Sequence, residues 1–383
     1  MDAVQLTADH DRAGRFGAAA APRLVVKIGS SLLVDDDGAV RRDWLASVLD
    51  DVAARRAGGQ AVVIVSSGAI ALGARRLGLA KRGRASLEDA QAAAACGQIM
   101  LSGAYAELLA ARGVTAAQIL LTLGDLEDRR RYLNAAATLD RLLTLGVVPV
   151  LNENDSVATA EIRFGDNDRL AARAAHAAGA GGVILLSDID GLYTADPASD
   201  PAARRIDTVV AVDHAVEAMA TAGSGSGLGS GGMVAKLQAA KIAQAAGIHL
   251  AIVDGRIAHP LAHFDATGVG TVFVAGDGAG ARKAWLAGRL TVAGRIVIDA
   301  GAAAALAAGR SLLAAGAVAV EGQFARGDAV EVIGPAGPVA RGLAGYDAAD
   351  AARILGMRND AQGPLLGYAP RAALVHRDHL VLL

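Results

Sequence analysis

The 383-residue chain holds a single cysteine, Cys96, and aromatic residues make up only 3% of it. One cysteine excludes an intrachain disulfide and any metal site built from several thiolates. Because 53% of the residues are nevertheless apolar, the hydrophobic core has to be built from Ala, Val, Leu and Ile. The 47 glycines follow no Gly-x-y period, which excludes a collagen-like chain.

Neither sign of charge is in excess: 37 Lys and Arg face 39 Asp and Glu, and the formal net charge is −2. A balanced charge gives no general attraction to nucleic acid or to anionic membranes. The sequence also lacks an apolar run of the ~20 residues that cross a membrane. Residues 1–22 contain Asp2, Asp9 and Asp11 and lack the apolar core of a secretory signal. We therefore expect a cytoplasmic protein with no membrane partner, whose residues 1–22 form a disordered tail.

Short apolar runs alternate with segments of helical spacing over most of the chain. Strands are predicted at residues 24–28, 60–65, 114–120, 147–151, 182–186 and 249–253. Helices are predicted at residues 43–56, 69–77, 86–111 and 125–145. Strands of this length that alternate with helices are typical of a mainly parallel sheet covered on both faces. The pattern therefore predicts an α/β/α sandwich.

The character of the sequence changes after residue 276. Residues 277–293 begin with Asp-Gly-Ala-Gly and are predicted to be a linker. Short β-like runs follow at 295–298, 317–320 and 329–333. We expect the division 1–22, 23–276, 277–293, 294–370 and 371–383, in which 294–370 is a small β-rich domain and 371–383 a C-terminal segment. A chain of this length has room for two domains.

Two polar clusters lie after the strand predicted at 147–151. The first is Asn152-Glu-Asn-Asp155, and the second is Gly165-Asp-Asn-Asp168. The first follows the carboxyl end of its strand, and this is the edge at which open α/β sheets bind ligands. Amides and carboxylates at that edge favour a small substrate that carries an ammonium and a carboxylate. A polar turn is the alternative, since turns also favour Asn and Asp.

Residues at two other strand ends indicate anion binding. Lys27 is embedded in the apolar strand 24–28, and Gly29 follows, where the backbone can approach a phosphate. A lysine in such a strand is costly unless its ammonium finds a partner at the strand end. Ser67 and Gly68 precede a predicted helix, whose N-terminus can hold a carboxylate. A solvent-reaching edge lysine and an ordinary N-cap serine remain the alternatives.

A stretch rich in Gly and Ser, residues 223–232, leads into a predicted helix that carries Lys236. No strand precedes it, which excludes a Rossmann dinucleotide loop, and Lys236 is not in the Gly-Lys-Ser/Thr context of a Walker A loop. We expect a phosphate-binding loop of neither class, with a flexible linker as the alternative. Ser187-Asp188 ends another strand and could contact a ribose or metal-bound phosphates, or form an ordinary capping pair.

Taken together and in this order, the motifs resemble the glutamate 5-kinases, the branch of the amino-acid kinase family that opens proline biosynthesis. The resemblance rests on residues 25–31, 65–70, 152–155, 165–168, 191–197 and 227–233. The tail from Gly294, with residues 322–328, resembles the PUA domain that many of these enzymes carry. The resemblance implies an amino-acid-kinase α/β/α fold with a PUA-like C-terminal domain. It also implies ATP with Mg²⁺ as cofactor and phosphorylation of the γ-carboxylate of L-glutamate.

The resemblance also implies roles for individual residues. Lys27 and Lys236 would neutralise the transferring phosphoryl group, and Asp168 would hold both ammonium groups in place. The residues implied in glutamate binding are Ser67, Gly68, Asn152, Asp155, Asp166 and Asn167. Those implied in ATP binding are Lys27, Gly29, Ser187, Asp188, Ser230, Gly231, Gly232, Met233, Val234, Ala235 and Lys236, and none is implied as a metal ligand. Serine stands where threonine is commoner at positions 30, 66, 187 and 230, and a hydroxyl is kept each time.

The family further implies a homo-oligomer, proline as a feedback inhibitor and the next reductase of the pathway as a partner, but no residue of this chain decides among these. Two alternative functions stay open. One is a related kinase that acts on another acid, such as aspartate, acetylglutamate or a nucleoside monophosphate. The other is an RNA-binding protein that works through its PUA-like tail, although this tail is not strongly basic.

Overall fold

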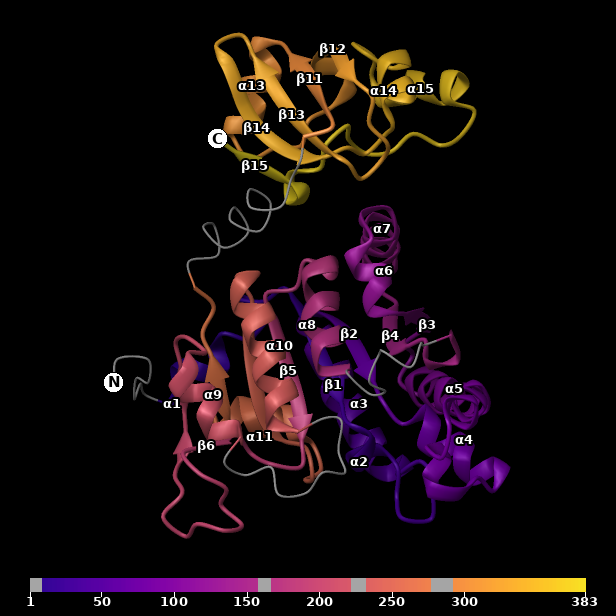
Figure 1. The fold of residues 1–383 in the computed structure, drawn as a ribbon, viewed down its shortest axis with the longest axis vertical. Helices are drawn as coiled ribbons and strands as arrows, with labels where there is room; N and C mark the ends of the chain where they lie inside the picture. Colours follow the sequence, from indigo (N-terminus) through magenta and orange to yellow (C-terminus); the bar gives the residue numbers. More distant parts are fainter. Residues whose placement is uncertain (1–8, 158–166, 222–231, 277–291) are drawn as a thin grey trace. The chain divides into compact units, whose positions relative to one another are not determined.

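A computed structural model of the chain describes residues 9–157, 167–221, 232–276 and 292–383. The chain divides into two compact units, Met1–Gly278 and Ala279–Leu383. Each unit has its own sheet (Figure 1). Each also has its own hydrophobic core. The predicted linker at 277–293 lies almost entirely outside the described residues.

The first unit is built on an eight-stranded sheet in the order β3-β4-β2-β1-β5-β9-β10-β8. The six strands from β3 to β9 pair in parallel, and β10 pairs antiparallel to β9 and parallel to β8. Their bounds are β1 Arg23–Ile28, β2 Ala61–Ser66, β3 Ala116–Leu121, β4 Val148–Glu153, β5 Gly182–Ser187, β8 Thr208–Val209, β9 His249–Asp254 and β10 Thr271–Phe273. The predicted mainly parallel sheet is confirmed.

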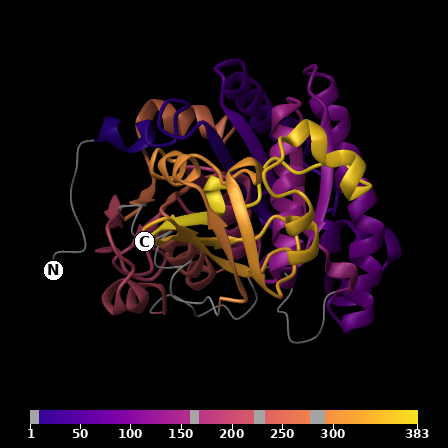
Figure 2. The ribbon, with the colours of Figure 1, turned by 90° about the horizontal axis from the view of Figure 1, so that it is seen from above.

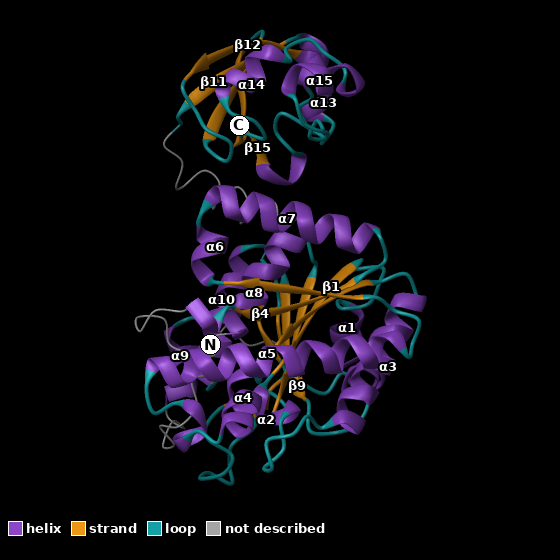
Figure 3. Cartoon of the chain, turned by 90° about the vertical axis from the view of Figure 1, so that its right-hand side faces the viewer, coloured by secondary structure: helices purple, strands orange, loops and turns teal. Residues whose placement is uncertain are grey.

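Helices cover both faces of this sheet, because its central strands are apolar on both sides (Figure 3). One face is covered by α7 (Arg129–Thr144), α8 (Asn167–Ala178) and α10 (Met233–Ala245). The other is covered by α3 (Arg42–Ala57), α5 (Leu87–Ala110) and α11 (Pro260–Thr267). Among the helices of the described residues, none is both long and apolar enough to cross a membrane.

Helices α4 (Ala69–Leu77) and α5 are in backbone contact where two glycines meet. A Cβ on Gly73 would lie 1.8 Å from the carbonyl oxygen of Ala93, and a Cβ on Gly97 would lie 1.8 Å from that of Ala69. Neither position can therefore hold a side chain without separating the helices. Since α4 follows β2 directly, this contact fixes the start of α4 beside the carboxyl edge of the sheet.

The prediction of a disordered tail over residues 1–22 is wrong for residues 9–22. Helix α1 (Asp9–Gly14) and the turn after it pack on the core, with Phe16 and Ala21 fully buried. The buried amide of Gln60 donates to the carbonyl oxygens of Phe16 and Ala21, at 2.8 and 2.7 Å. Residues 9–22 are ordered because one aromatic residue and a few alanines fill a gap beside α11. So few apolar residues do not form a pattern that the sequence analysis could recognise.

The single helix predicted over 125–145 is divided into α6 (Leu123–Glu127) and α7. Asp128 adopts an extended backbone, and its carboxylate accepts a hydrogen bond from the Arg131 amide at 2.9 Å. Asp125 and Thr122 form a capping box at the start of α6. Two cap residues in one charged stretch therefore start two helices rather than one.

The remaining elements of the first unit are short. They are α2 Ser30–Leu33, η1 Ala80–Gly83, η2 Asp155–Val157, β6 Leu192–Tyr193, β7 Arg205–Ile206 and α9 His214–Thr221. Strands β6 and β7 pair antiparallel, so residues 191–197 supply the first strand of a hairpin.

The second unit contains a five-stranded sheet in the order β12-β11-β13-β14-β15, drawn in orange and yellow in Figure 2. Its strands are β11 Gly294–Ile298, β12 Ala317–Gly322, β13 Ala329–Gly334, β14 Gly337–Leu343 and β15 Leu380–Leu382. Its helices are α13 Ala300–Ala307, η3 Ala314–Gly316, α14 Ala348–Arg353, α15 Asn359–Leu366 and η4 Arg377–His379. Residues 371–383 were predicted to be a separate C-terminal segment. Because β15 pairs with β14, they are instead part of this β-rich unit.

We predict that Phe16→Ala lowers the free energy of unfolding of the first unit by about 3–5 kcal/mol. Phe16 is fully buried and packs edge-to-face on Phe264, with ring centroids 5.6 Å apart. Urea titration followed by circular dichroism measures the change. Leu145→Ala is the control, because Leu145 is 57% exposed and its loss should change stability by less than about 0.5 kcal/mol. Equal stabilities for the two variants would mean that residues 9–22 do not pack on the core.

Candidate active site

Lys27 lies in β1, the strand between β2 and β5, and its side chain is buried at 6% exposure. Its Nζ is 2.5 Å from Oδ1 of Asp168, at the start of α8. Lys236, in the first turn of α10, places its Nζ 3.3 Å from Oδ2 of the same carboxylate. Three elements far apart in the sequence thus bring two ammonium groups to one carboxylate. We call Lys27, Asp168 and Lys236 the lysine pair with its carboxylate.

The buried charges set the electrostatics of this group. Burial by itself raises the pKa of Asp168, but the charges of Lys27 and Lys236 outweigh it, so its pKa lies below the ordinary value. Burial is also the largest influence on Lys236 and lowers its pKa, while the charge of Asp168 opposes this. With all three groups ionised, one positive charge is left over. A buried positive excess is costly unless an anion compensates it, so the group is suited to bind a phosphate.

Two glycines leave space around the lysines. Gly29 lies beside the ammonium of Lys27, since a Cβ there would be 3.8 Å from Nζ. Gly232 precedes α10 and has no side-chain cap, and a Cβ on it would meet no described atom within 4 Å. Of the implied ATP-binding residues, Met233, Val234, Ala235 and Lys236 form the first turn of α10, whereas Ser230 and Gly231 lie outside the described residues.

Ser187 and Asp188 follow the same edge of the sheet at the end of β5. Ser187 is buried, and its hydroxyl donates to Oδ1 of the exposed Asp188 at 3.2 Å. β5 is the direct neighbour of β1, with Leu185 paired to Lys27. The two residues therefore lie next to the strand that carries the first lysine.

The turn after β2 is fixed by a glycine and a tyrosine. Gly68 has φ +111°, in the left-handed region, and a Cβ there would come within 3.2 Å of Val34 Cγ2. The fully buried Tyr105 donates its hydroxyl to Oγ of Ser66 at 2.9 Å, and burial raises the pKa of Tyr105. Ser67 is thereby held at the edge of the sheet. Tyr105 is a contributor that the sequence analysis missed.

Amide side chains connect this turn to the first polar cluster. Asn167 donates through Nδ2 to Oγ of Ser67 at 2.8 Å and to Oδ1 of Asn152 at 3.0 Å. Asn152 donates through its own Nδ2 to Oε1 of Gln98 at 2.8 Å. Asn152 and Asn167 are each 2% exposed. The structure thus joins the two polar clusters directly, through the bond from Asn167 to Asn152. Gln98, which the sequence analysis did not single out, contacts Asn152 from its other end.

Two buried oxygens of this cluster point to a missing donor. Oδ1 of Asp155 and Oδ1 of Asn167 have no hydrogen-bond partner within the described part of the chain. Burial raises the pKa of Asp155 to about 6, although the charge of Arg84 opposes the rise. We call Asp155 Oδ1 and Asn167 Oδ1 the two open acceptors. Buried acceptors are normally satisfied, so a ligand that carries several N–H donors fits here. Asp166, also implied in substrate binding, lies outside the described residues.

A hollow of about 250 Å³ lies beside Asp155. Its walls come from the start of α4, from α5 and from the ends of β3 and β4, and they include Gln98, Gln118 and Glu153. The volume is enough for one small polar molecule. The lysine pair with its carboxylate and this hollow both lie along the carboxyl edge of the parallel strands. In the sheet, β2, β4 and β3 lie on one side of β1, and β5 and β9 lie on the other.

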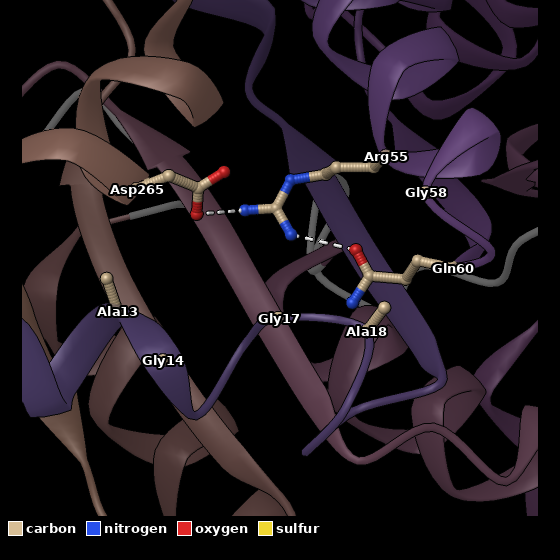
Figure 4. A pocket seen from close by; sticks show the side chains of 8 residues that line it. All are labelled: Ala13, Gly14, Gly17, Ala18, Arg55, Gly58, Gln60 and Asp265. Carbon is tan, nitrogen blue, oxygen red and sulfur yellow. Dashed lines mark hydrogen bonds and ion pairs between the residues drawn. The ribbon is translucent and has the colours of Figure 1, made fainter.

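A second hollow, of about 400 Å³, lies at the opposite, amino edge of the sheet (Figure 4). Figure 4 shows Arg55 between Asp265 and Gln60, and its guanidinium contacts them at 2.6 and 2.8 Å. Arg55 also donates to the carbonyl of Phe16 at 2.9 Å. None of the residues that the sequence assigned to the site lines this hollow. Its polar groups anchor the segment after α1.

The comparisons with known proteins agree with this geometry. The model of the amino acid kinase family matches residues 22–254, and the model of the PUA domain matches residues 294–361. The chain is 67% identical to a glutamate 5-kinase of Sphingopyxis alaskensis over 369 residues, which cover 96% of this chain and 99% of that one. It is 62% identical to a glutamate 5-kinase of Novosphingobium aromaticivorans, covering 96% of this chain and 97% of that one. The corresponding enzyme of Zymomonas mobilis is 59% identical, with 94% and 91% covered. The chain therefore belongs to the amino acid kinase family, in its glutamate 5-kinase branch, and carries a PUA domain.

Proposed function

We propose that this protein transfers the γ-phosphoryl group of ATP to the γ-carboxylate of L-glutamate, which forms L-glutamyl 5-phosphate for proline biosynthesis. The proposal rests on one observation: the lysine pair with its carboxylate and the two open acceptors lie close together on one edge of the sheet. Lys27 and Lys236 share one buried carboxylate and suit a phosphoryl group. The two open acceptors, with the hollow beside them, suit the ammonium end of an amino acid.

The reaction needs little covalent help from the protein. An oxygen of the γ-carboxylate attacks the γ-phosphorus of ATP, a new P–O bond forms, and the bond to the β-phosphate oxygen breaks as ADP leaves. The attacking carboxylate is already ionised at neutral pH, so no general base is required. Lys27 and Lys236 stabilise the charge on the transferred group, and Asp168 keeps both ammonium groups in position without protonation, because its pKa is lowered.

The α-ammonium of glutamate has three donors, and we assign two of them to Asp155 Oδ1 and Asn167 Oδ1. A charge-assisted bond to Asp155 would also compensate the burial of that carboxylate. Ser67 and Gly68, at the fixed turn after β2, are assigned to the substrate carboxylate, with Asp166 as a further contact. Asn152 is nearly saturated by Gln98, Glu153 and Asn167, so we assign it to orient Asn167.

ATP is assigned to the side of the site formed by β1, β5 and α10. Gly29 and Gly232 allow the phosphates to approach. The first turn of α10 and residues 230–231 are assigned to bind the phosphates. Ser187 and Asp188 are assigned to the ribose. ATP is used with Mg²⁺, which would supply further charge to its phosphates. Among the described residues, no group of three or more His, Cys, Asp or Glu side chains is placed to hold a metal. We therefore assign no residue as a ligand and expect the ion to arrive on ATP.

Other partners follow from the family and are proposals of the same kind. We expect a homo-oligomer in the cytoplasm, inhibition by proline, and transfer of the reactive product to a reductase. RNA binding by the PUA domain is tested by filter binding at several salt concentrations, since phosphate contacts give a steep salt dependence. The RNA-binding role would be excluded if no RNA bound at low salt, or if the binding did not change with the salt concentration.

The decisive experiment is an assay with ATP, Mg²⁺, glutamate and hydroxylamine, which traps the acyl phosphate as a hydroxamate. We expect hydroxamate and ADP in equal amounts with glutamate, and little of either with aspartate, acetylglutamate or a nucleoside monophosphate. A stronger reaction with one of those acids would reassign the substrate but keep the kinase. ADP release that does not depend on any acid would refute the proposal.

We predict that Lys236→Ala lowers kcat by roughly 10²–10³-fold while the KM for glutamate changes little. The charge of Lys236 acts mainly as the phosphoryl group leaves ADP, and Lys27→Ala should behave in the same way. The matched control is Lys241→Ala, because Lys241 lies on the same helix but pairs at the surface with Glu217. A Lys236 variant that keeps more than about a tenth of the wild-type kcat would contradict the assigned role.

We predict that the unliganded protein loses stability relative to Asp155→Asn as the pH rises from 4 to 7. The pKa of Asp155 is raised in the folded state to about 6 from 3.8, so folding favours the protonated form. This stabilisation is complete below the unfolded pKa and is lost as the pH rises through the folded pKa. At about 1.4 kcal/mol per pKa unit, the difference reaches roughly 3 kcal/mol. Urea titrations of both proteins at several pH values measure it.

The same substitution has an opposite effect on substrate binding. Because only the ionised Asp155 pairs with an ammonium, the wild-type KM for glutamate should rise as the pH falls below about 6. The KM of Asp155→Asn should be high and nearly independent of pH, while the KM for ATP stays unchanged. Equal loss of both affinities would indicate a collapsed site rather than one lost contact.

We predict that the chain cut after residue 276 folds and still phosphorylates glutamate. Every residue assigned to glutamate or ATP lies between Lys27 and Lys236, and the sheet and core of the first unit end before this point. Circular dichroism and the hydroxamate assay test both parts of the prediction. A folded but inactive fragment would show that the PUA domain completes the active site.

A further inference from the structure

Gln98 occupies a central place between helix α5 and the substrate cluster. Its Oε1 accepts a hydrogen bond from Nδ2 of Asn152 at 2.8 Å, and its Nε2 donates to Oγ of Ser102 at 3.1 Å, one turn further along the helix. The hydroxyl of Ser102 in turn contacts Oε1 of Gln118 on β3. Both ends of the Gln98 amide are therefore used, and Oε1 is the end that faces the site.

The direction of this amide fixes the direction of the next two. Because Gln98 presents an acceptor, Asn152 turns its Nδ2 toward Gln98 and its Oδ1 toward Asn167. Asn167 donates through its Nδ2 to Oδ1 of Asn152, to Oγ of Ser67 and to the backbone carbonyl oxygen of Ser66, the last at 3.3 Å. Its Oδ1 is left as one of the two open acceptors. Asn152 is thus oriented by Gln98, and Asn167 is oriented by Asn152 together with the carbonyl oxygen of Ser66.

The reverse orientation would be unfavourable at every step. If Asn152 were turned over, its Oδ1 would face Oε1 of Gln98 and its Nδ2 would face Nδ2 of Asn167. Asn167 would then have to turn its oxygen away from the substrate side. The backbone amide of Glu153 also donates to Oδ1 of Asn152, at 2.9 Å, and it favours the same direction as Gln98. Two groups therefore orient Asn152, and Gln98 is the only one of them whose side chain can be exchanged.

We infer that Gln98 is a positioning residue for the amino-acid substrate: through Asn152 it keeps Oδ1 of Asn167 directed at the substrate ammonium. This rests on the proposed function, in which that ammonium binds the two open acceptors. Gln98 also lines the hollow beside Asp155, so it lies close enough to the substrate for its own polarity to matter. ATP binding and phosphoryl transfer do not involve it.

The test compares two substitutions in the full chain with the hydroxamate assay. Gln98→Met keeps the size of the side chain but removes the acceptor, and leaves a buried Asn152 amide unpaired. We expect it to raise the KM for glutamate on the order of ten-fold, with kcat and the KM for ATP changed by less than about two-fold. Gln98→Glu keeps an acceptor toward Asn152, and its KM for glutamate should stay within about three-fold of wild type.

Gln60→Met is the matched control. Gln60 is a buried glutamine of the same unit, but it donates to Phe16 and Ala21 at the amino edge of the sheet. Its substitution should lower thermal stability and leave the KM for glutamate unchanged. A purely structural role of Gln98 would make Gln98→Met behave in this way, with a lowered melting temperature and no separation of KM from kcat.

A double-mutant cycle shows whether Gln98 acts through Asn152. In an Asn152→Ala background, Gln98→Met should have no further effect on the KM for glutamate, because the side chain that it orients is gone. The inference is overturned if the effect persists in that background, if Gln98→Met has the wild-type KM, or if the Met and Glu variants raise it equally. Absence of glutamate-dependent hydroxamate in the wild type would instead refute the proposed function.

Discussion

The site depends on the contact of one carboxylate with two ammonium groups. Lys27 lies in a strand that is buried on both faces, and such a position is unfavourable for a lysine unless an opposite charge lies at the strand end. Asp168 supplies this charge and holds Lys236 at the same time. Because two ammonium groups share one carboxylate, the carboxylate compensates only part of their positive charge. Under the proposed function a phosphate of the nucleotide would supply the remaining compensation, and this would link the stability of this region to nucleotide binding.

The parallel sheet makes this contact possible, because all of its central strands end at one edge. β1 lies between β2 and β5, so the residues that follow these strands become neighbours although they are far apart in the sequence. α8 brings Asn167 and Asp168 to the same edge as adjacent residues. Asn167 extends toward Ser67 and the substrate side, and Asp168 extends toward the lysines. One helix start therefore serves both halves of the proposed reaction and fixes the distance between them.

The sequence was sufficient to predict the parallel sheet and the β-rich second unit, because apolar runs are local patterns. The pairing of the two lysines with Asp168 was implied by the family resemblance and not by a local pattern. The sequence was not sufficient for contacts that depend on packing. Gln98 lies in an alanine-rich helix, and the packing of α5, which includes its contact with α4 at Gly73 and Gly97, places it at the site. Phe16 appeared in a polar N-terminal stretch, yet it fills a gap next to α11. Short strands such as β8 and β10 have too few residues to show a period.

The two open acceptors show why a site of this kind is less stable without its ligand. A buried carboxylate with a pKa near 6 is partly protonated in mildly acidic solution, and at neutral pH it is a buried charge whose Oδ1 has no hydrogen-bond partner among the described residues. Removing either oxygen would relieve that cost but would also remove the means of recognising an ammonium. The amide relay from Gln98 through Asn152 keeps the second acceptor in the same unfavourable but useful orientation. An N-acylated amino acid keeps only one, uncharged N–H donor, so it can satisfy at most one of the two oxygens and cannot compensate the charge of Asp155. Under the proposed function, selectivity for a free amino acid would therefore arise from the same buried groups that destabilise the empty site.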